Sequence, residues 1–270
     1  MALVNTIPQK LIFAIVAVLL GLSGYLTASV LAAPESIQDS QIIISTELKD
    51  VSESDIERVR REAEKALKSI PPILGFEYKK KIEIRIVDDG ICRTTPDEHI
   101  IFLPIWHIKN KRAAIVHEVS HAIARRHENN SFFSEGLAEF FQVKFGEDIA
   151  GAAYYNEPLY LSLDDLVIKH RDTLISLSYL KNNNDVYMPT DPEKRKLAYI
   201  EAGSFIKFLY EVHGGRKLQD LYCTWTLDYE MVYGKNFKEL EAEWLNYVLR
   251  EQEARHQEQD NSDIKNEYSN

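Results

Sequence analysis

The chain has 270 residues, of which 45% are hydrophobic and 27% are charged, a composition typical of a globular protein with a sizeable core. Its net charge of −10, without a basic stripe that carries interleaved aromatic residues, argues against a nucleic-acid partner. Two distant cysteines, Cys92 and Cys223, provide neither a disulfide framework nor a Cys-x-x-Cys zinc site, and whether they pair is left open.

An apolar leader precedes the globular part of the chain. Residues 11–22 have the length of a signal-peptide core, and Val30-Leu31-Ala32 is an acceptable cleavage site. Alternatively, residues 11–33 carry no charge and are long enough to stay in a membrane as an uncleaved anchor. Lys10 precedes this run and acidic residues follow it, which favours export of the remainder. Residues 1–33 are therefore predicted to be a signal peptide or a membrane anchor of a secreted, periplasmic or cell-surface protein.

Predicted strands are confined to the N-terminal part of the remaining chain, and helices dominate the rest. Apolar alternation and turn residues predict strands at residues 42–46, 81–87 and 98–103. Helical periodicity predicts helices at residues 52–70, 111–126, 134–145, 163–177, 197–213, 216–225 and 236–251. This distribution indicates an α+β fold, with a small mixed sheet and a mainly helical C-terminal lobe.

The predicted domain covers residues 34–252, with the sheet and the motif helix in 34–127 and the helical lobe in 128–252. The first predicted helix ends before Pro71, because proline interrupts a helix. The polar stretch 181–196 predicts a long loop, either a lid or an inert solvent loop. Residues 253–270 are rich in Glu, Gln, Asp, Asn and Ser and predict a disordered tail.

The segment HEVSH carries the clearest chemical signal of the chain. His117 and His121 lie four residues apart, so on a helix both imidazoles point to a common region one turn apart. A tetrahedral zinc ion accepts such a pair, and Glu118 beside the first ligand can act as the base for a zinc-activated water. An ordinary helix with incidental histidines is the alternative. The apolar residues that surround the motif argue against it, because buried polar groups need partners.

Catalytic zinc ions usually have three protein ligands and one open position. Glu135, in the segment SEGLAEFF, is one candidate for the third ligand. His127 is the other, at the spacing of a metzincin site, but Ala124 stands where that pattern has a helix-breaking glycine. If the helix continues, His127 faces away from His121 and is expected to be an exposed cation at the helix end.

Glu139 lies one helical turn after Glu135 and on the same face. A histidine that binds zinc usually donates its other ring N–H to an acceptor. Glu139 is expected to be this acceptor for His117 or His121. A solvent-facing charge is the alternative reading of Glu139.

The segments HEVSHAIA and FFSEGLAEFF resemble the gluzincin branch of the zinc metallopeptidases, in particular its peptidase-MA-like families. AYIEAGSFIKFLYEVHG and YGKNFKELEAEWLNYV extend this resemblance, which covers residues 41–250. It implies a zincin-like fold and one Zn²⁺ per chain, bound by His117, His121 and Glu135. It also implies that Glu118 is the base and that Tyr199 hydrogen-bonds the developing oxyanion. Tyr199 as a packed residue without a catalytic role stays an alternative.

The resemblance implies a metallopeptidase that acts on a peptide or protein substrate outside the cytoplasm. The amine-binding loop of the related aminopeptidases is missing, so aminopeptidase activity is not implied. The predicted strand 98–103 is expected to be either a sheet edge that binds an extended peptide or an ordinary covered strand. Two other readings stay open: a membrane-associated module that holds zinc without catalysis, and a metzincin that uses His127. The sequence does not indicate the oligomeric state.

Overall fold

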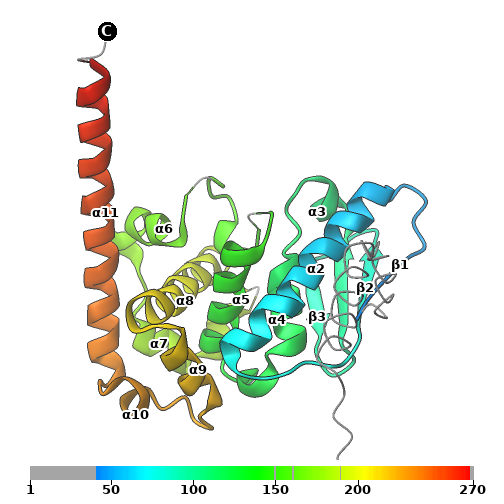
Figure 1. The fold of residues 1–270 in the computed structure, drawn as a ribbon, viewed down its shortest axis with the longest axis horizontal. Coiled ribbons are helices and arrows are strands. Elements are labelled where there is room, and N and C mark those ends of the chain that lie inside the picture. The colour runs from blue at the N-terminus through cyan, green and yellow to red at the C-terminus, as the bar shows by residue number, and fades with distance from the viewer. Residues whose placement is uncertain (1–40, 149, 160, 189, 268–270) are drawn as a thin grey trace, which may run out of the picture. The chain divides into compact units, whose positions relative to one another are not determined.

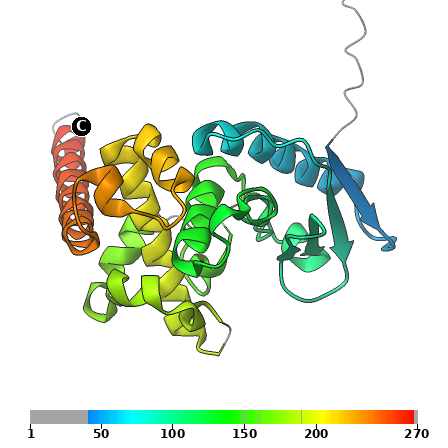
Figure 2. The ribbon, with the colours of Figure 1, turned by 90° about the horizontal axis from the view of Figure 1, so that it is seen from below.

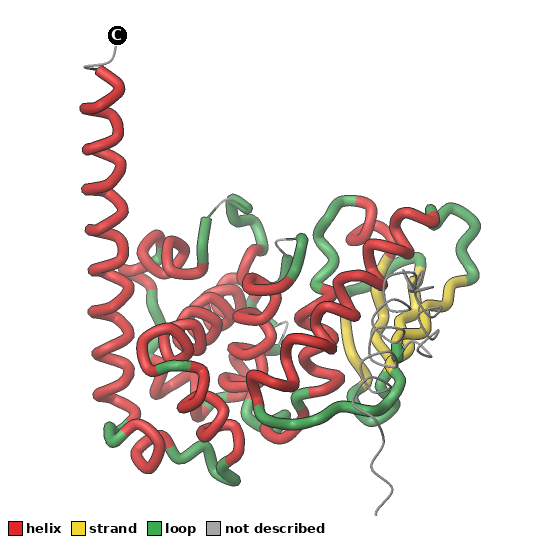
Figure 3. Tube along the Cα trace, viewed as in Figure 1, coloured by secondary structure: helices red, strands yellow, loops and turns green. Residues whose placement is uncertain are grey.

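A four-stranded mixed sheet forms one end of the described chain (Figures 1 and 3). The computed structural model describes residues 41–148, 150–159, 161–188 and 190–267. The strands are β1 (Ile42–Thr46), β2 (Ile82–Val87), β3 (Arg93–Thr95) and β4 (Ile100–Pro104). Their order in the sheet is β1-β2-β4-β3, with parallel pairing of β1, β2 and β4 and antiparallel pairing of β3 with β4. The α+β class predicted from the sequence is confirmed.

One face of this sheet is apolar and is covered by helices. Ile82, Ile84 and Ile86 alternate along β2 and are buried, whereas Glu83 and Arg85 point to the other face and form an ion pair of 2.8 Å. The helices α2 (Glu53–Leu74) and α4 (Ile115–Ile123) pack against the sheet and against each other (Figure 2). The period-two pattern gives the sheet an apolar face. Helix α4, which carries HEVSH, contacts strands β3 and β4.

The position of β4 decides between the two readings of the predicted strand 98–103. β4 lies between β2 and β3, so it is an internal strand and not an edge. The edge next to α4 is β3, which the sequence does not predict because three residues, Arg93–Thr95, are too few for a periodic pattern. Pairing with β4 holds this short segment in the extended conformation.

The prediction that the first helix ends before Pro71 is wrong. Helix α2 continues through Pro71 and Pro72 to Leu74, and Gly75 ends it with a left-handed φ of 75°. Each proline removes one helical hydrogen bond, but both lie near the helix end. Burial of the Ile70, Pro71 and Leu74 side chains stabilises this last turn against the core.

The single helix predicted for residues 111–126 is also wrong in its bounds. A separate short helix, α3 (Ile105–Lys109), precedes this segment. The segment itself contains α4 (Ile115–Ile123) and then a 3₁₀ turn, η1 (Arg125–His127). Lys111 has a left-handed φ of 55°, and Ala124 has φ −98° and ψ 56°. These two non-helical conformations separate the elements, although neither residue is one that typically breaks a helix.

The regular elements after η1 are helices and short 3₁₀ turns, as far as the chain is described. They are α5 (Ser131–Phe145), η2 (Ala152–Tyr154), α6 (Leu163–Lys169), η3 (Arg171–Thr173), α7 (Leu177–Asn182), η4 (Asn184–Tyr187), α8 (Pro192–His213), α9 (Gly215–Cys223), α10 (Tyr229–Tyr233) and α11 (Phe237–Glu267). Helices α5 and α8 lie side by side in the middle of the lobe (Figure 1). Phe132, Phe141, Phe205 and Phe208 are fully buried between the helices of this lobe.

Several bounds in the lobe differ from the predictions. The helix predicted for 163–177 is interrupted by η3, and the loop predicted for 181–196 is largely α7, η4 and the start of α8. Asp191 and Pro192, which contribute to the prediction of a loop, are instead the N-cap and the first residue of α8. Helix α11 continues to Glu267 across most of the tail that is predicted to be disordered, in a segment rich in good helix formers.

The predicted leader, residues 1–33, lies outside the described residues. In the part of the chain that is described, no helix is both long enough and apolar enough to span a membrane. Cys92 and Cys223 are both free thiols, so they do not pair with each other.

Candidate metal centre

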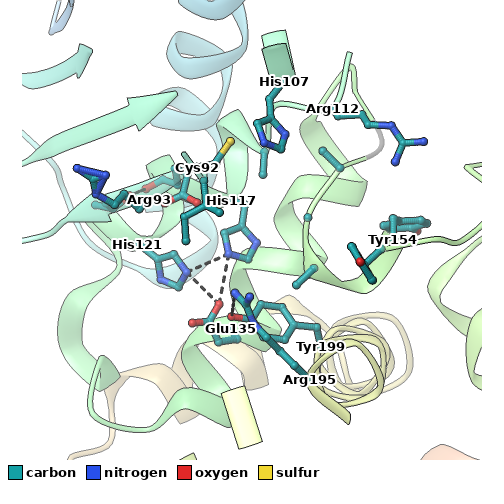
Figure 4. A pocket seen from close by; sticks show the side chains of 18 of the residues that line it. Cys92, Arg93, His107, Arg112, His117, His121, Glu135, Tyr154, Arg195 and Tyr199 are labelled. Carbon is teal, nitrogen blue, oxygen red and sulfur yellow. Dashed lines mark hydrogen bonds and ion pairs between the residues drawn. The ribbon is translucent and has the colours of Figure 1, made fainter. Parts of the chain in front are cut away.

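Three side chains converge beside the sheet, on the α4–α5 helix pair (Figure 4). The Nε2 atoms of His117 and His121 lie 3.1 Å apart. Glu135 Oε2 lies 3.1 Å from Nε2 of His121 and 3.3 Å from Nε2 of His117. Three potential ligand atoms from two helices therefore form a nearly equilateral triangle.

The dimensions of this triangle match a tetrahedral zinc site. Zinc–nitrogen bonds of about 2.0–2.1 Å at tetrahedral angles separate neighbouring ligand atoms by about 3.3–3.4 Å. The distances of 3.1–3.3 Å between the three atoms agree with this edge length. Two nitrogens and one carboxylate oxygen are also a ligand set that zinc accepts, and a triangle leaves one vertex open. The donor set and its geometry therefore fit one Zn²⁺.

Helix α4 is fixed at its N-terminal turn by a side chain of α5. Gln142 Oε1 accepts the backbone N–H of His117 at 2.9 Å, and Gln142 Nε2 donates to the carbonyl of Asp148 at 2.7 Å. The first-turn N–H groups of a helix lack partners within the helix. Gln142 satisfies one of these groups and thereby ties the histidine helix to the glutamate helix.

A close approach of α8 to α5 completes the surroundings of the triangle. A Cβ atom at Gly136 would lie 2.8 Å from the carbonyl oxygen of Ala202, and one at Gly203 would lie 2.9 Å from Cβ of Glu139. Glycine at these two positions lets the helices pack closely. As a result, the ring of Tyr199 on α8 stacks on His117, with centroids 6.1 Å apart and an angle of 11° between the planes.

The outer nitrogens of both histidines face polar groups. Ser134 Oγ lies 3.3 Å from Nδ1 of His121, and Glu139 Oε1 lies 3.5 Å from Nδ1 of His117. Glu139 is fully buried, so the reading of Glu139 as a solvent-facing charge is wrong. Burial raises the pKa of Glu139 to about 7, although His117 opposes this shift. Glu139 is thus placed to orient the His117 ring through Nδ1.

We expect the substitution Glu139→Gln to weaken zinc binding by about 10- to 100-fold, the usual effect of removing an outer partner of a histidine ligand. Glutamine keeps the size of the buried side chain but removes the carboxylate that faces Nδ1 of His117. Zinc affinity is measured by competition with a chromogenic chelator. Glu230→Gln, on the exposed surface of α10, serves as the control. A zinc affinity equal to that of the wild type would contradict the role of Glu139 as the partner of His117.

The electrostatic field of the site favours a positive charge. Burial lowers the pKa of His117, but the carboxylates of Glu135, Glu139 and Glu118 outweigh it and raise the pKa to about 9. Burial raises the pKa of Glu135, yet the neighbouring His121 and His117 hold it well below its usual range. A divalent cation bound by the three atoms would supply the positive charge that these carboxylates favour.

Glu118 is held by the edge strand. Thr94 Oγ1 lies 2.7 Å from Glu118 Oε2, to which it donates, and 2.9 Å from the Glu118 backbone oxygen. Glu118 is buried, and both Glu118 and Thr94 line the cavity into which the triangle opens. The carboxylate is therefore fixed by one oxygen, beside the histidines and outside the ligand triangle.

Tyr199 and Arg195 lie one turn apart on α8 and line the same cavity (Figure 4). Arg195 Nη2 lies 3.4 Å from the Tyr199 hydroxyl. Burial, followed by the charge of Glu135, raises the pKa of Tyr199 well above its usual value. The hydroxyl group stays protonated and can donate a hydrogen bond.

His127 does not belong to the triangle. It is buried, its Nε2 donates to the carbonyl of Tyr222 at 2.8 Å, and its ring contacts Phe133 edge to face. Burial lowers the pKa of His127. The expectation of an exposed cation at the helix end is therefore wrong, because α4 stops at Ile123 and η1 turns the side chain inward.

The cavity has a volume of about 1080 Å³, near the upper end of the usual range for ligand pockets. It is bounded by β3 and the segment before it, by α4 and α5, by η2, and by the start of α8. Trp106 and Ile91 are exposed at its wall. Comparison of the chain with protein-family models, curated proteins and solved structures gave no match in any of the three.

Sequence reasoning did not single out four residues of this site: Thr94, Ser134, Gln142 and Arg195. Gln142 continues the helical spacing of Glu135 and Glu139, so helical periodicity alone carries a signal for it. Arg195 precedes Tyr199 by one turn, within a segment predicted to be a loop. Thr94 has no such signal, because only the pairing of β3 brings it to Glu118.

Proposed function

We propose that the protein is a zinc-dependent metallopeptidase of the gluzincin type with a zincin-like fold. The observation that carries this proposal is the convergence of His117, His121 and Glu135 within 3.1–3.3 Å, with Glu118 beside them. A site that only needs zinc for stability has no use for a carboxylate next to the ligands. A base held in place by Thr94 favours hydrolysis over a silent zinc module.

A bound Zn²⁺ would polarise the scissile carbonyl and lower the pKa of a water molecule. Glu118 would take the proton of the attacking water and pass it to the leaving amine, because Thr94 occupies only its Oε2. Tyr199 would donate its hydroxyl proton in a hydrogen bond to the carbonyl oxygen as negative charge develops there. Ser134 and Glu139 would orient the two histidines through their outer nitrogens.

The edge strand β3 is suited to hold an extended substrate. Its backbone pairs with β4 along one edge, and its residues Arg93 and Thr94 line the cavity. A peptide can add to such an edge through main-chain hydrogen bonds. A peptide-binding sheet edge is one of the two readings of strand 98–103, and we propose this role for β3 instead. The predicted leader would deliver the enzyme to the outside of the cytoplasm, where its substrates are expected.

Zinc content and cleavage of a mixed peptide library test this proposal. The full-length chain should contain one zinc per molecule, by elemental mass spectrometry, and should cleave peptides in the library. Removal of the metal with a chelator should stop cleavage, and added Zn²⁺ should restore it. Cleavage that persists without metal would contradict the proposal. Bound zinc without cleavage of any peptide would favour the silent zinc module.

A further inference from the structure

Arg195 points into the cavity without an acidic partner. Its guanidinium group lies over the Tyr199 ring at 5.2 Å, its Nε atom is buried without a hydrogen-bond partner, and its Nη2 has a long 3.4 Å contact with the Tyr199 hydroxyl. Among the described residues it pairs with no carboxylate. A guanidinium group has five N–H donors, and burying it without a partner costs free energy. Arg195 is half-buried and lines the cavity, so the terminal Nη groups of its guanidinium are available to a ligand.

Two other charged groups of the cavity wall, Lys196 and Glu128, have ion-pair partners. Lys196 Nζ lies 2.9 Å from Glu157 and 2.7 Å from Glu193. Glu128, which also lines the cavity, pairs with Arg125 at 3.0 Å. The chain has 42 acidic and 32 basic residues, so carboxylates are in excess. The lack of one at Arg195 is therefore a property of this cavity and not of the composition.

Two further arginines line the cavity. Arg93 comes from β3 and lies over the ring of Phe102 at 4.0 Å, and Arg112 precedes α4. Neither forms an ion pair with a carboxylate of the described residues. In Figure 4 Arg93, Arg112 and Arg195 lie on three sides of the histidine pair. Three arginines of the cavity wall therefore lack a carboxylate partner in the described part of the chain, although Arg93 and Arg112 are exposed and the carboxylates of Glu118 and Glu135 line the same cavity.

We infer that the preferred substrates are peptides that carry a carboxylate near the scissile bond, and that Arg195 binds this carboxylate. This inference rests on the proposed peptidase function. A carboxylate accepts two parallel N–H bonds from a guanidinium group and would satisfy the unpartnered donors of Arg195. The position of Arg195, one turn from Tyr199, places such a carboxylate beside the ligand triangle. Its source is either the C-terminus of the peptide or an Asp or Glu side chain.

Binding of matched peptides to the full-length, zinc-loaded Glu118→Gln protein tests the inference. Short fluorescent peptides of one sequence are made as the free acid and as the C-terminal amide, each with Glu or Gln at successive positions. Affinity is measured by fluorescence anisotropy. The free-acid arm and the Glu arm separate the two sources of the carboxylate, and the amide with Gln is the neutral reference.

In this background Arg195→Gln should weaken binding of carboxylate-bearing peptides by about 10- to 100-fold, the usual range for a lost hydrogen bond to a charged group. Binding of the neutral peptide should change by less than about threefold. Arg195→Lys keeps the charge and should restore part of the affinity. Arg216→Gln, which removes an exposed arginine of α9, is the matched control and should leave all affinities unchanged.

Equal losses for acidic and neutral peptides would overturn the inference, because Arg195 would then act on the peptide backbone. The inference would also be overturned if Arg195→Gln lost no affinity for any peptide. The same holds if the Glu118→Gln protein did not bind carboxylate-bearing peptides more tightly than neutral ones. Its failure differs from failure of the proposed function. Library cleavage without a preference for carboxylates would retain the peptidase and reject the role of Arg195. Carboxylate binding through Arg195 without cleavage of any peptide would retain the role of Arg195 and reject the peptidase.

Discussion

The substitution Glu118→Gln is expected to lower kcat for peptide hydrolysis by about 10²- to 10⁴-fold, the usual contribution of a general base. Glutamine has the size of glutamate and can still accept the hydrogen bond from Thr94, which lies 2.7 Å from Oε2 in the wild type. It cannot take a proton from water at neutral pH. Because Glu118 lies outside the ligand triangle, zinc content should stay at that of the wild type. Steady-state kinetics and elemental analysis measure the two effects.

Glu57→Gln is the matched control for this experiment, because Glu57 lies on the exposed face of α2 and its side chain is 66% accessible. It should leave both turnover and zinc content unchanged. If Glu118→Gln hydrolyses peptides as fast as the wild type, water activation by Glu118 is refuted. If the variant loses its zinc instead, Glu118 supports the metal and its role as a base is not separable from binding.

The second large effect is expected for the third ligand. Glu135→Ala removes one corner of the triangle, in which Oε2 lies 3.1 Å from His121 and 3.3 Å from His117. Removal of an outer partner of a ligand typically lowers metal affinity by about 10- to 100-fold. Removal of the ligand itself should lower zinc affinity by more than this. His127→Ala should leave zinc affinity unchanged, because its Nε2 is engaged by the Tyr222 carbonyl. Competition with a chelator of known affinity measures both variants.

His127→Ala should instead act on stability. It removes the donor to a buried carbonyl, which lowers the free energy of unfolding by about 1–3 kcal/mol in urea denaturation. The opposite pattern of metal loss, in which His127→Ala loses zinc and Glu135→Ala retains it, is that of a metzincin. That outcome would contradict the ligand set proposed here.

The sequence predicted those features that depend on local periodicity. The alternation of Ile82, Ile84 and Ile86 gave β2, and the overall distribution of strands and helices gave the α+β class. The spacing of His117 and His121 on one helix likewise follows from helical geometry alone. Their proximity to Glu135 needs the chain to reverse between α4 and α5, and η1 provides this reversal.

The sequence did not predict features that are decided by tertiary contacts. Helix α4 ends at Ile123 although its next residue is alanine, because the inward turn of His127 is stabilised by Phe133 and the carbonyl of Tyr222. β3 exists only through its pairing with β4. Arg195 lacks a carboxylate partner only because none of the described elements that face it brings a carboxylate close. The local sequence pattern cannot indicate this.

Anomalous X-ray scattering on crystals of the zinc-loaded protein, with data collected on both sides of the zinc absorption edge, tests the central proposal most directly. One peak per chain is expected within about 2.0–2.2 Å of Nε2 of His117, Nε2 of His121 and an Oε atom of Glu135. Glu118 should lie outside this coordination sphere. A peak bound by other side chains, or a protein that holds no zinc after loading, would contradict it.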